Sequence, residues 1–387
     1  MKVSISVPGR FHLFNLAQEL IKKDYLSQLI TSYPKFEVKK YGIPEEKISS
    51  VISKEILMRG WEKFPDFLKD IWNPQFFIHE IFDKSASKKL RTCDIFVGGS
   101  SVSLHTFQKA KEFNAIFVLE RGSSHMEYQR DILIEEYQKF GIDVQKSFML
   151  PHPKIVEKEL KEYEEADYIS IPSLFVKSTF LEKGIPESKL IHVPYGVDLS
   201  RFKQIPKEDD IFRVVFAGGM SLRKGVHYLL KAFSELKLPN SELLLIGSIN
   251  EEIKPFFKKY EGSFRYIGHV PQAELYKHYS QGSVFAMMSI EEGLALVQPQ
   301  AMACGLPVIA TTNTGAEDIV RDGKDGFIIP IRDVEKLKEK LIYLYEHPVE
   351  REEMAVSAKE HVSSGFTWDD YGDKMIKEYE RILRNTK

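Results

Sequence analysis

Short apolar runs alternate along this chain with segments whose apolar residues recur every three or four positions. Lys2–Val7 is a run of the first kind and predicts a buried strand, whereas Leu13–Lys23 predicts an amphipathic helix. In the first half, the same alternation predicts further strands at Leu29–Ser32, Asp94–Gly98, Ala115–Leu119, Tyr168–Pro172 and Lys189–Pro194. Strands separated by helices indicate parallel βαβ units with right-handed crossovers.

The segment 34–91 does not follow this alternation. It is helical in pattern, and its aromatic residues are Trp61, Phe64, Phe67, Trp72, Phe76, Phe77 and Phe82. Lysines and arginines are interleaved with these aromatics between residues 54 and 89. Aromatic residues at helical spacing are usually core, so the pattern predicts a helical insertion with a small core of its own. An acceptor-binding or membrane-touching face over 54–91 is the alternative, and peripheral membrane contact stays open.

The alternation restarts after a polar, proline-containing stretch, Lys203–Asp210, which is typical of a linker. Strands are then predicted at Arg213–Ala217, Glu242–Ile246, Phe264–Ile267, Val284–Met288, Pro307–Thr311 and Gly326–Pro330, and three helices follow to the end. The fold class is therefore α/β, with two doubly wound parallel-sheet domains joined near residue 205. Ligands bind such sheets at the carboxyl ends of the strands, so we expect a cleft between the two domains.

Bulk composition limits the protein class. A chain of 387 residues is too long for one core, and a net charge of −2 gives no reason to expect a nucleic-acid partner. The two cysteines, Cys93 and Cys304, lie far apart and allow no disulfide framework or zinc spacing. The first residues lack the apolar run of a signal peptide. A cytoplasmic location is expected, with the cytoplasmic face of the membrane as an alternative.

The stretch Ser289–Thr312 carries the first candidate chemistry. A predicted strand runs into acidic residues, a glycine, a helix start and a second strand. Backbone N–H groups around Gly293, Leu294 and Ala295 would form an anion site with the positive end of the helix dipole. Glu292 stands at its edge, where a carboxylate accepts hydrogen bonds from hydroxyls. An anion site beside a hydroxyl-binding carboxylate suits a phosphorylated sugar such as a nucleotide-sugar.

Several motifs together resemble the retaining glycosyltransferases of family 4 (glycosyl transferases group 1), which have the GT-B architecture. The segments that carry the resemblance are Ile171–Phe175, Val193–Asp198, Phe216–Gly225, Glu292–Gln300, Gly315–Glu317 and Phe366–Tyr371. The match is dense from residue 168 onward and thin before it. The resemblance implies an acceptor-side Rossmann-like domain over 1–205 and a nucleotide-sugar-binding one over 206–366. It also implies a final helix, 367–387, that crosses back to the first domain.

The resemblance also implies roles for individual residues. Lys224 is expected to pair with the diphosphate leaving group, Glu292 to bind hydroxyls of the donor sugar, and His125 to line the reaction centre. The donor-binding set is Gly9, Arg10, Gly218, Gly219, Arg223, Gly268, His269, Val270, Gly293, Leu294, Ala295, Leu296 and Gln300. The less specific alternatives are a solvated surface lysine for Lys224, a loop acid or helix cap for Glu292, and a structural histidine for His125.

The chain departs from the family pattern at three positions. Gln300 stands where a second glutamate holds the ribose hydroxyls, so a weaker hold on the ribose is expected. Gly219 stands at the usual arginine of the phosphate loop, and Arg10 follows Gly9 where a second glycine is common. Our hypothesis is that Arg10 reaches the diphosphate and replaces the missing charge.

Candidates on the acceptor side are His12, Glu120 and Arg121, which follow two predicted strands of the first domain. His12 has the capping of the first helix as an alternative role. The acidic pairs at 209–210 and 369–370 follow no strand of the cleft, and no cluster of histidines and acids shows ligand spacing. We therefore expect no required metal and no cofactor.

The expected activity is transfer of a sugar from a nucleotide-diphospho-sugar to an acceptor hydroxyl, with retention at the anomeric carbon. The acceptor would be a glycan, a lipid-linked molecule or a small molecule. Alternatives are a nucleotide-sugar epimerase or phosphorylase of the same architecture, and a non-catalytic sugar-nucleotide binder. The sequence does not indicate the donor base, the sugar or the oligomeric state.

Overall fold

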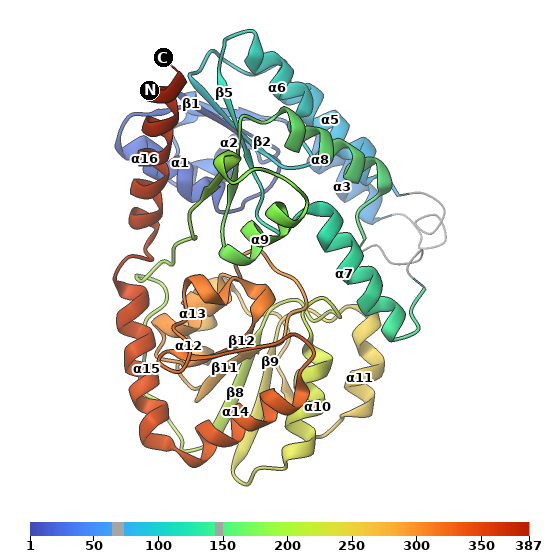
Figure 1. The fold of residues 1–387 in the computed structure, drawn as a ribbon, viewed down its shortest axis with the longest axis vertical. Helices are drawn as coiled ribbons and strands as arrows, with labels where there is room; N and C mark the ends of the chain where they lie inside the picture. The colour runs from blue at the N-terminus through green and yellow to red at the C-terminus, as the bar shows by residue number, and fades with distance from the viewer. Residues whose placement is uncertain (64–72, 144–149, 387) are drawn as a thin grey trace.

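Two α/β domains are stacked end to end in the computed structural model of this protein (Figure 1). The structure describes residues 1–63, 73–143 and 150–386. Phe64, Phe67 and Trp72, three aromatics of the expected insertion, lie outside the described residues.

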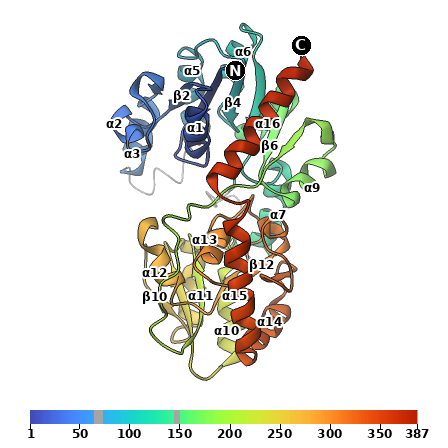
Figure 2. The same cartoon turned by 90° about the vertical axis from the view of Figure 1, so that its left-hand side faces the viewer.

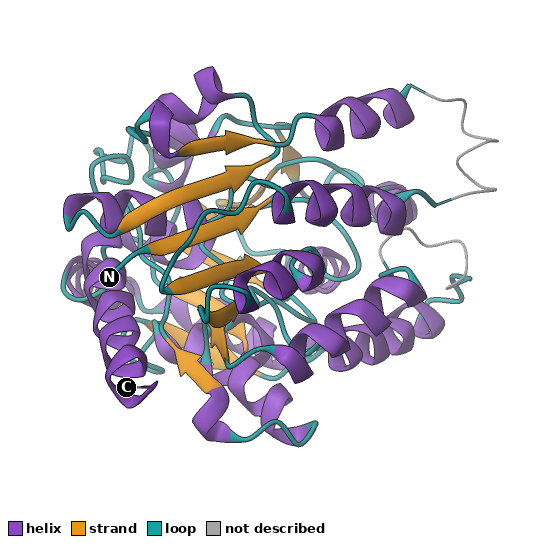
Figure 3. Ribbon diagram, turned by 90° about the horizontal axis from the view of Figure 1, so that it is seen from above, coloured by secondary structure: helices purple, strands orange, loops and turns teal. Residues whose placement is uncertain are grey.

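The N-terminal domain is built on a parallel sheet in the order β3-β2-β1-β4-β5-β6-β7. Its strands are β1 Val3–Val7, β2 Leu26–Thr31, β3 Ile48–Ser50, β4 Ile95–Gly99, β5 Ile116–Glu120, β6 Tyr168–Ile171 and β7 Leu190–His192. Seen from above, neighbouring strands point the same way with helices around them (Figure 3). Every residue of β1 is buried, as expected for a parallel strand that is covered on both faces.

The expected helical insertion at 34–91 is corrected in part, because this segment also contributes an edge strand. Ile48 of β3 pairs with Leu29 of β2, and β3 forms one end of the main sheet. Helices α2 Lys35–Lys39, α3 Ser53–Glu62 and α5 Gln75–Ser87 surround it. A strand of three residues carries too few alternating positions to be recognised from the sequence pattern.

The C-terminal domain is built on a second parallel sheet in the order β10-β9-β8-β11-β12-β13. Its strands are β8 Phe212–Ala217, β9 Ser241–Ile246, β10 Arg265–Tyr266, β11 Val284–Met287, β12 Val308–Thr311 and β13 Gly326–Ile329. Its helices are α10 Val226–Leu236, α11 Lys254–Lys259, α12 Leu275–Tyr279, α13 Val297–Ala303, α14 Val334–Glu346 and α15 Pro348–Ser363. In the N-terminal half the remaining helices are α1 Leu13–Lys22, α6 Leu104–Lys111, α7 Met126–Lys139, α8 Pro153–Glu165 and α9 Leu174–Glu182.

The last helix, α16 Trp368–Thr386, returns to the N-terminal domain and packs beside α1 (Figure 2). Tyr371, Met375, Tyr379 and Ile382 are buried at a helical spacing, which gives α16 one apolar face. Lys22 of α1 adds an ion pair of 2.5 Å with Asp369. The expected fold class, two facing Rossmann-like domains with a helix that crosses back, is confirmed.

Helix α7 belongs to the N-terminal half of the sequence but packs into the other domain. Its apolar residues Ile132, Leu133 and Tyr137 lie in the same buried cluster as Val226 of α10 and Met288. A boundary at residue 205 therefore does not separate the two hydrophobic cores. Among the described residues, no helix is both long enough and apolar enough to cross a bilayer.

Candidate active site

A cavity of about 930 Å³ lies between the two domains, at the carboxyl ends of the first strands. From the N-terminal domain it is lined by Gly9, Arg10, His12, Tyr41, Glu120, Arg121, Gly122, Ser123 and Tyr195, among others. From the C-terminal domain it is lined by Arg223, Gln272, Leu294, Leu296 and Gln300, and α16 contributes Trp368. The expected cleft is therefore present and has contributions from both halves of the chain.

Lys224 and Glu292 form an ion pair in the C-terminal domain, next in sequence to the cavity-lining Arg223 and close to Leu294, although neither residue of the pair lines the cavity itself. Both side chains are largely buried, at 24% and 11% exposed, so a solvated surface lysine is not what the structure shows. Lys224 ends the turn before α10, and Glu292 lies in the loop after β11. The backbone holds them together, because Gly225 has φ of +62° and a Cβ there would overlap the carbonyl oxygen of Met288.

Glu291, next to Glu292, has a different role. It is fully buried and accepts hydrogen bonds from Ser124 N at 3.0 Å, Gln129 Nε2 at 2.8 Å and Arg223 Nε at 2.8 Å. Burial alone would raise its pKa, but the charge of Arg223 and these hydrogen bonds outweigh burial and lower the pKa to about 2. Glu291 therefore joins the two domains as a permanent anion.

The charge of Arg223 is largely taken up by Glu291. Its guanidinium also donates to Ser123 Oγ at 3.2 Å, across the domain boundary. The basic residue beside Lys224 thus holds the domains together, although it also lines the cavity.

Gly293 brings the donor-side loop against the N-terminal domain. A Cβ at this position would overlap the carbonyl oxygen of Gly122, so the two backbones are in direct contact. Ser173 Oγ donates to the carbonyl oxygen of Gly293 at 2.7 Å and fixes the loop from a second side. Leu294 and Ala295 are buried just beyond it.

The other expected donor-binding residues lie around the C-terminal side. Gly218 and Gly219 follow β8, and Gly268, His269 and Val270 follow β10, next to the cavity-lining Gln272. Gln300 of α13 is 7% exposed and lines the cavity. The expected helix start is short, because α13 has seven residues and begins only at Val297. The positive end of α13 therefore lies directly after the amides around residue 294, and their support by the helix dipole stays a prediction.

Arg10 and Gly9 lie on the opposite side of the cavity. The Arg10 guanidinium donates to the Tyr41 hydroxyl, and its central carbon lies 5.4 Å from the centre of the Tyr41 ring. Arg10 forms no ion pair with a described acidic residue. Its charge is therefore not neutralised by a described carboxylate.

His12 and Glu120 form the second charged feature of the cavity. His12 Nε2 lies 2.7 Å from Glu120 Oε1, and the His12 ring stacks on Tyr195 with centroids 4.1 Å apart. Glu120 ends strand β5 and is 3% exposed. Capping of the first helix by His12 is not seen, since α1 has no side-chain cap.

His125 and Arg121 are placed differently from expectation. His125 Nδ1 accepts from the backbone N of Glu127 at 3.3 Å and caps α7. Its ring packs on Tyr163 and Phe180, and burial lowers its pKa to about 4. The expectation that His125 lines the reaction centre is corrected, because its ring points into a core of aromatic residues and is absent from the cavity lining.

Arg121 lines the cavity, but its guanidinium is already paired. It lies 2.9 Å from Glu159 and donates twice to the carbonyl oxygen of Ser124. Its main contacts are therefore structural.

Sequence reasoning missed several residues of this site. Tyr41, Tyr195 and Trp368 line the cavity, and the acid next to the expected one, Glu291, holds the domains together. Tyr195 and Trp368 stood in segments that match the family, 193–198 and 366–371, but were not singled out as site residues. Tyr41 carried no local signal, because it comes from an element far along the chain from the motifs.

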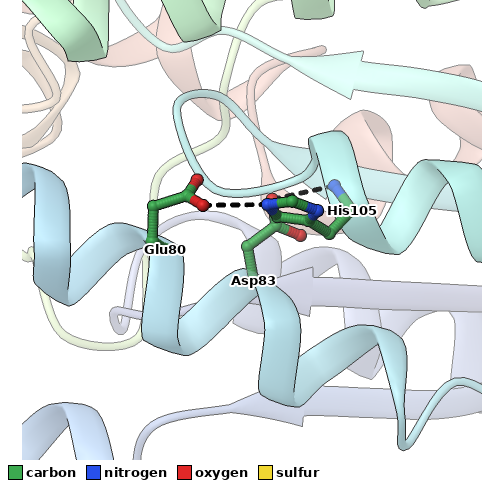
Figure 4. Close-up of side chains that lie close together, drawn as sticks. All are labelled: Glu80, Asp83 and His105. Carbon is green, nitrogen blue, oxygen red and sulfur yellow. Dashed lines mark hydrogen bonds and ion pairs between the residues drawn. The ribbon is translucent and has the colours of Figure 1, made fainter.

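A group with metal-ligand composition also went unrecognised in the sequence. Glu80 and Asp83 of α5 approach His105 of α6 closely enough to share an ion, and the three residues form the contacts drawn in Figure 4. Lys158, however, lies 2.7 Å from both carboxylates and neutralises them. Asp83 also accepts from the backbone N of His105 at 2.9 Å, at the start of α6. The group is therefore a buried ion-pair cluster that caps a helix.

Two facing Rossmann-like domains with a cavity between their strand ends define a GT-B protein. Residues 198–361 match the family model described as glycosyl transferases group 1.

Two similar relatives are phosphatidylinositol monomannoside mannosyltransferases whose names call them GDP-mannose-dependent. The one from Corynebacterium glutamicum is 28% identical over 54% of this chain and 61% of its own length. The one from Mycolicibacterium smegmatis is 28% identical over 55% of this chain and 62% of its own length. The chain thus matches about three fifths of these curated relatives.

Solved structures share the whole fold. Sucrose-phosphate synthase from Thermosynechococcus elongatus superposes with a TM-score of 0.74 at 17% identity, covering 100% of both chains. HepE of Anabaena in complex with UDP-glucose superposes with a TM-score of 0.70 at 15% identity, covering 98% of this chain and 100% of the other. At these identities the likeness shows the fold alone.

Proposed function

We propose that this protein is a glycosyltransferase that moves a sugar from a nucleotide-diphospho-sugar to an acceptor hydroxyl, with retention at the anomeric carbon. The observation that carries the proposal is the Lys224–Glu292 ion pair, which lies beside residues that line the interdomain cavity and within the segment that matches the group 1 family model.

The pair places a positive charge, which a diphosphate requires, next to a carboxylate, which can bind the hydroxyls of the attached sugar. A fixed ammonium group stabilises the negative charge that grows on the diphosphate as the glycosidic bond breaks. A carboxylate accepts hydrogen bonds from sugar hydroxyls. In the structure these groups neutralise each other, so donor binding would exchange one ion pair for two substrate contacts.

Arg10 supplies a second positive charge on the opposite side of the same cavity. It lies beside Tyr41 and has no described acidic partner. With Lys224 it can hold the diphosphate from two sides, which supports a reaction without a required metal ion. Gln300 lines the cavity where the ribose is expected, and its amide would bind the hydroxyls without the strength of a carboxylate.

Retention is proposed from the family resemblance. In a same-face reaction the acceptor oxygen bonds to the anomeric carbon as the diphosphate oxygen leaves, and the leaving phosphate takes the hydroxyl proton. The donor to test first is GDP-mannose, because two relatives are named for it, and UDP-glucose is second, because HepE is in complex with it. The acceptor class is a lipid-linked molecule, a glycan or a small molecule.

A thermal-shift panel of nucleoside diphosphates and their sugars tests the proposal. A donor at 100 times its Kd stabilises a protein by about 2.7 kcal/mol, which gives a measurable increase in Tm. Product analysis then distinguishes the reaction types. A glycosyltransferase releases free nucleoside diphosphate, an epimerase returns an altered donor, and a phosphorylase needs phosphate. A protein that binds none of the compounds is not a nucleotide-sugar enzyme.

A further inference from the structure

Glu120 has one carboxylate oxygen that no protein group uses. Its Oε1 receives His12 Nε2 at 2.7 Å and the Tyr195 hydroxyl at 3.4 Å. Its Oε2 is buried and has no hydrogen-bond partner in the protein. A buried charged oxygen without a donor is costly, so such an atom calls for an explanation.

The neighbouring tyrosines do not remove this deficit. Burial raises the pKa of Tyr195, Tyr371 and Tyr379 well above the usual value, and the negative charge of Glu120 raises it further. These hydroxyls therefore keep their protons beside the carboxylate. The Tyr371 and Tyr379 hydroxyls form no hydrogen bond with it. Both tyrosines belong to the buried face of α16 that packs against α1.

The cavity adjoins Glu120. Glu120 and His12 both line it, together with Gly122 and Tyr195. Gly122 has no side chain between the pair and the cavity, and a Cβ there would lie 3.0 Å from the Tyr195 hydroxyl and 3.6 Å from His12 Cε1. The carbonyl oxygen of Gly122 in turn touches Gly293, the residue after Glu292. Glu120 thus lies two residues before the backbone contact with the loop that is proposed to hold the donor sugar.

We propose that Glu120 Oε2 accepts a hydrogen bond from the attacking hydroxyl of the acceptor, and that His12 is the positioning residue that holds this carboxylate. The inference rests on the proposed function. The hydroxyl of the acceptor substrate would donate the hydrogen bond that Oε2 lacks. This bond would orient the hydroxyl so that a lone pair of its oxygen points toward the anomeric carbon of the donor sugar. The proton leaves with the diphosphate, as in the same-face reaction, so Glu120 begins and ends each turnover as a carboxylate.

The test uses the full chain with whichever of GDP-mannose and UDP-glucose raises its Tm, with water and glycerol as acceptors. In Glu120→Gln, which keeps the size of the side chain, we expect nucleoside diphosphate release and glycosyl-glycerol formation to fall about 10²-fold. Donor affinity, measured by calorimetry, should stay within twofold. A reduced rate with an unchanged donor affinity distinguishes loss of acceptor positioning from loss of the fold or of the donor site.

The positioning role of His12 has its own readout. His12→Phe keeps a ring on Tyr195 and removes the nitrogen that holds Glu120, so a smaller loss of about tenfold is expected. The double variant should be no slower than Glu120→Gln alone, because both changes act through one carboxylate. Glu157→Gln, an exposed change of the same kind on α8, is the matched control and should leave both rates unchanged.

Three outcomes contradict the inference without touching the proposed function. The first is a Glu120→Gln variant with wild-type rates. The second is a Glu120→Gln variant whose donor affinity falls as much as its rate. The third is a sugar covalently attached to Glu120, seen in the mass spectrum of the wild-type protein incubated with donor. A wild-type protein that binds no compound of the thermal-shift panel, or that binds a donor and never releases nucleoside diphosphate from it, contradicts the proposed function instead.

Discussion

The two sides of the interdomain cavity are built in different ways. On the C-terminal side, Lys224 and Glu292 lie in loops that directly follow β8 and β11, and each belongs to a short recognisable motif. On the N-terminal side, His12 and Glu120 are 108 residues apart and meet only because β1 and β5 end at the same edge of one sheet. The comparison shows that the residues proposed to bind the donor come from local motifs, whereas those proposed to bind the acceptor are brought together by the topology.

Replacing the hydroxyl-binding carboxylate on the C-terminal side should have the largest effect. Glu292→Gln removes the partner of Lys224 and the proposed acceptor of sugar hydroxyls, so we expect turnover to fall about 10³-fold. The rate of nucleoside diphosphate release from the donor checks this. Glu157→Gln controls for the general effect of losing a glutamate, and a loss under threefold in Glu292→Gln would show that the pair is structural.

Removing the ammonium group of Lys224, on the same side, should have the second-largest effect on turnover. Lys224→Met keeps the length of the side chain and removes the charge, and we expect a fall in turnover of about 10²-fold, because the charge stabilises the departing diphosphate. Lys231→Met, an exposed change on α10, is the matched control. Equal rates in the two variants would contradict the proposed contact with the diphosphate.

The contact between the two sides can be tested through its pH dependence. The pKa of Glu291 is lowered from 4.5 to about 2 in the folded protein, which corresponds to about 3 kcal/mol of stabilisation. A lowered pKa means that this contribution is present above pH 4.5 and is lost as the pH falls toward 2.

Calorimetry of wild type and Glu291→Gln across this range measures the effect. The variant should have the lower Tm at pH 7, and the difference between the two proteins should narrow as the pH decreases below 4.5. A difference that is constant with pH would mean that the charge of Glu291 does not hold the domains together.

The smallest effect is expected on the N-terminal side. Arg10 is exposed and its charge is screened by solvent, so Arg10→Ala should weaken the binding of a nucleoside diphosphate by about fivefold. Calorimetry with the diphosphate alone measures this, and Arg384→Ala near the end of α16 is the control. An unchanged affinity would remove the idea that Arg10 replaces the charge missing at Gly219.

The local pattern was sufficient for the two-domain α/β fold and for most strands, because apolar runs of four or more residues are read directly from the sequence. It was not sufficient for β3, whose three residues include a single buried apolar side chain, Ile48. It also did not reveal that α7 packs into the opposite domain, because an amphipathic helix shows which of its faces is buried but not the surface that covers it.

The site divides in the same way. By itself, the sequence predicted the candidate residues whose motif is contiguous: Lys224 beside its glycine, and Glu292 followed by the loop that touches the other domain. Only the tertiary structure decided which histidine faces the cavity. His12 and His125 each follow a strand, but the backbone after β5 turns His125 into an aromatic core, whereas His12 is held at the cavity by Glu120. The physical reason is that a side chain's direction depends on contacts with distant elements, and no local pattern encodes these contacts.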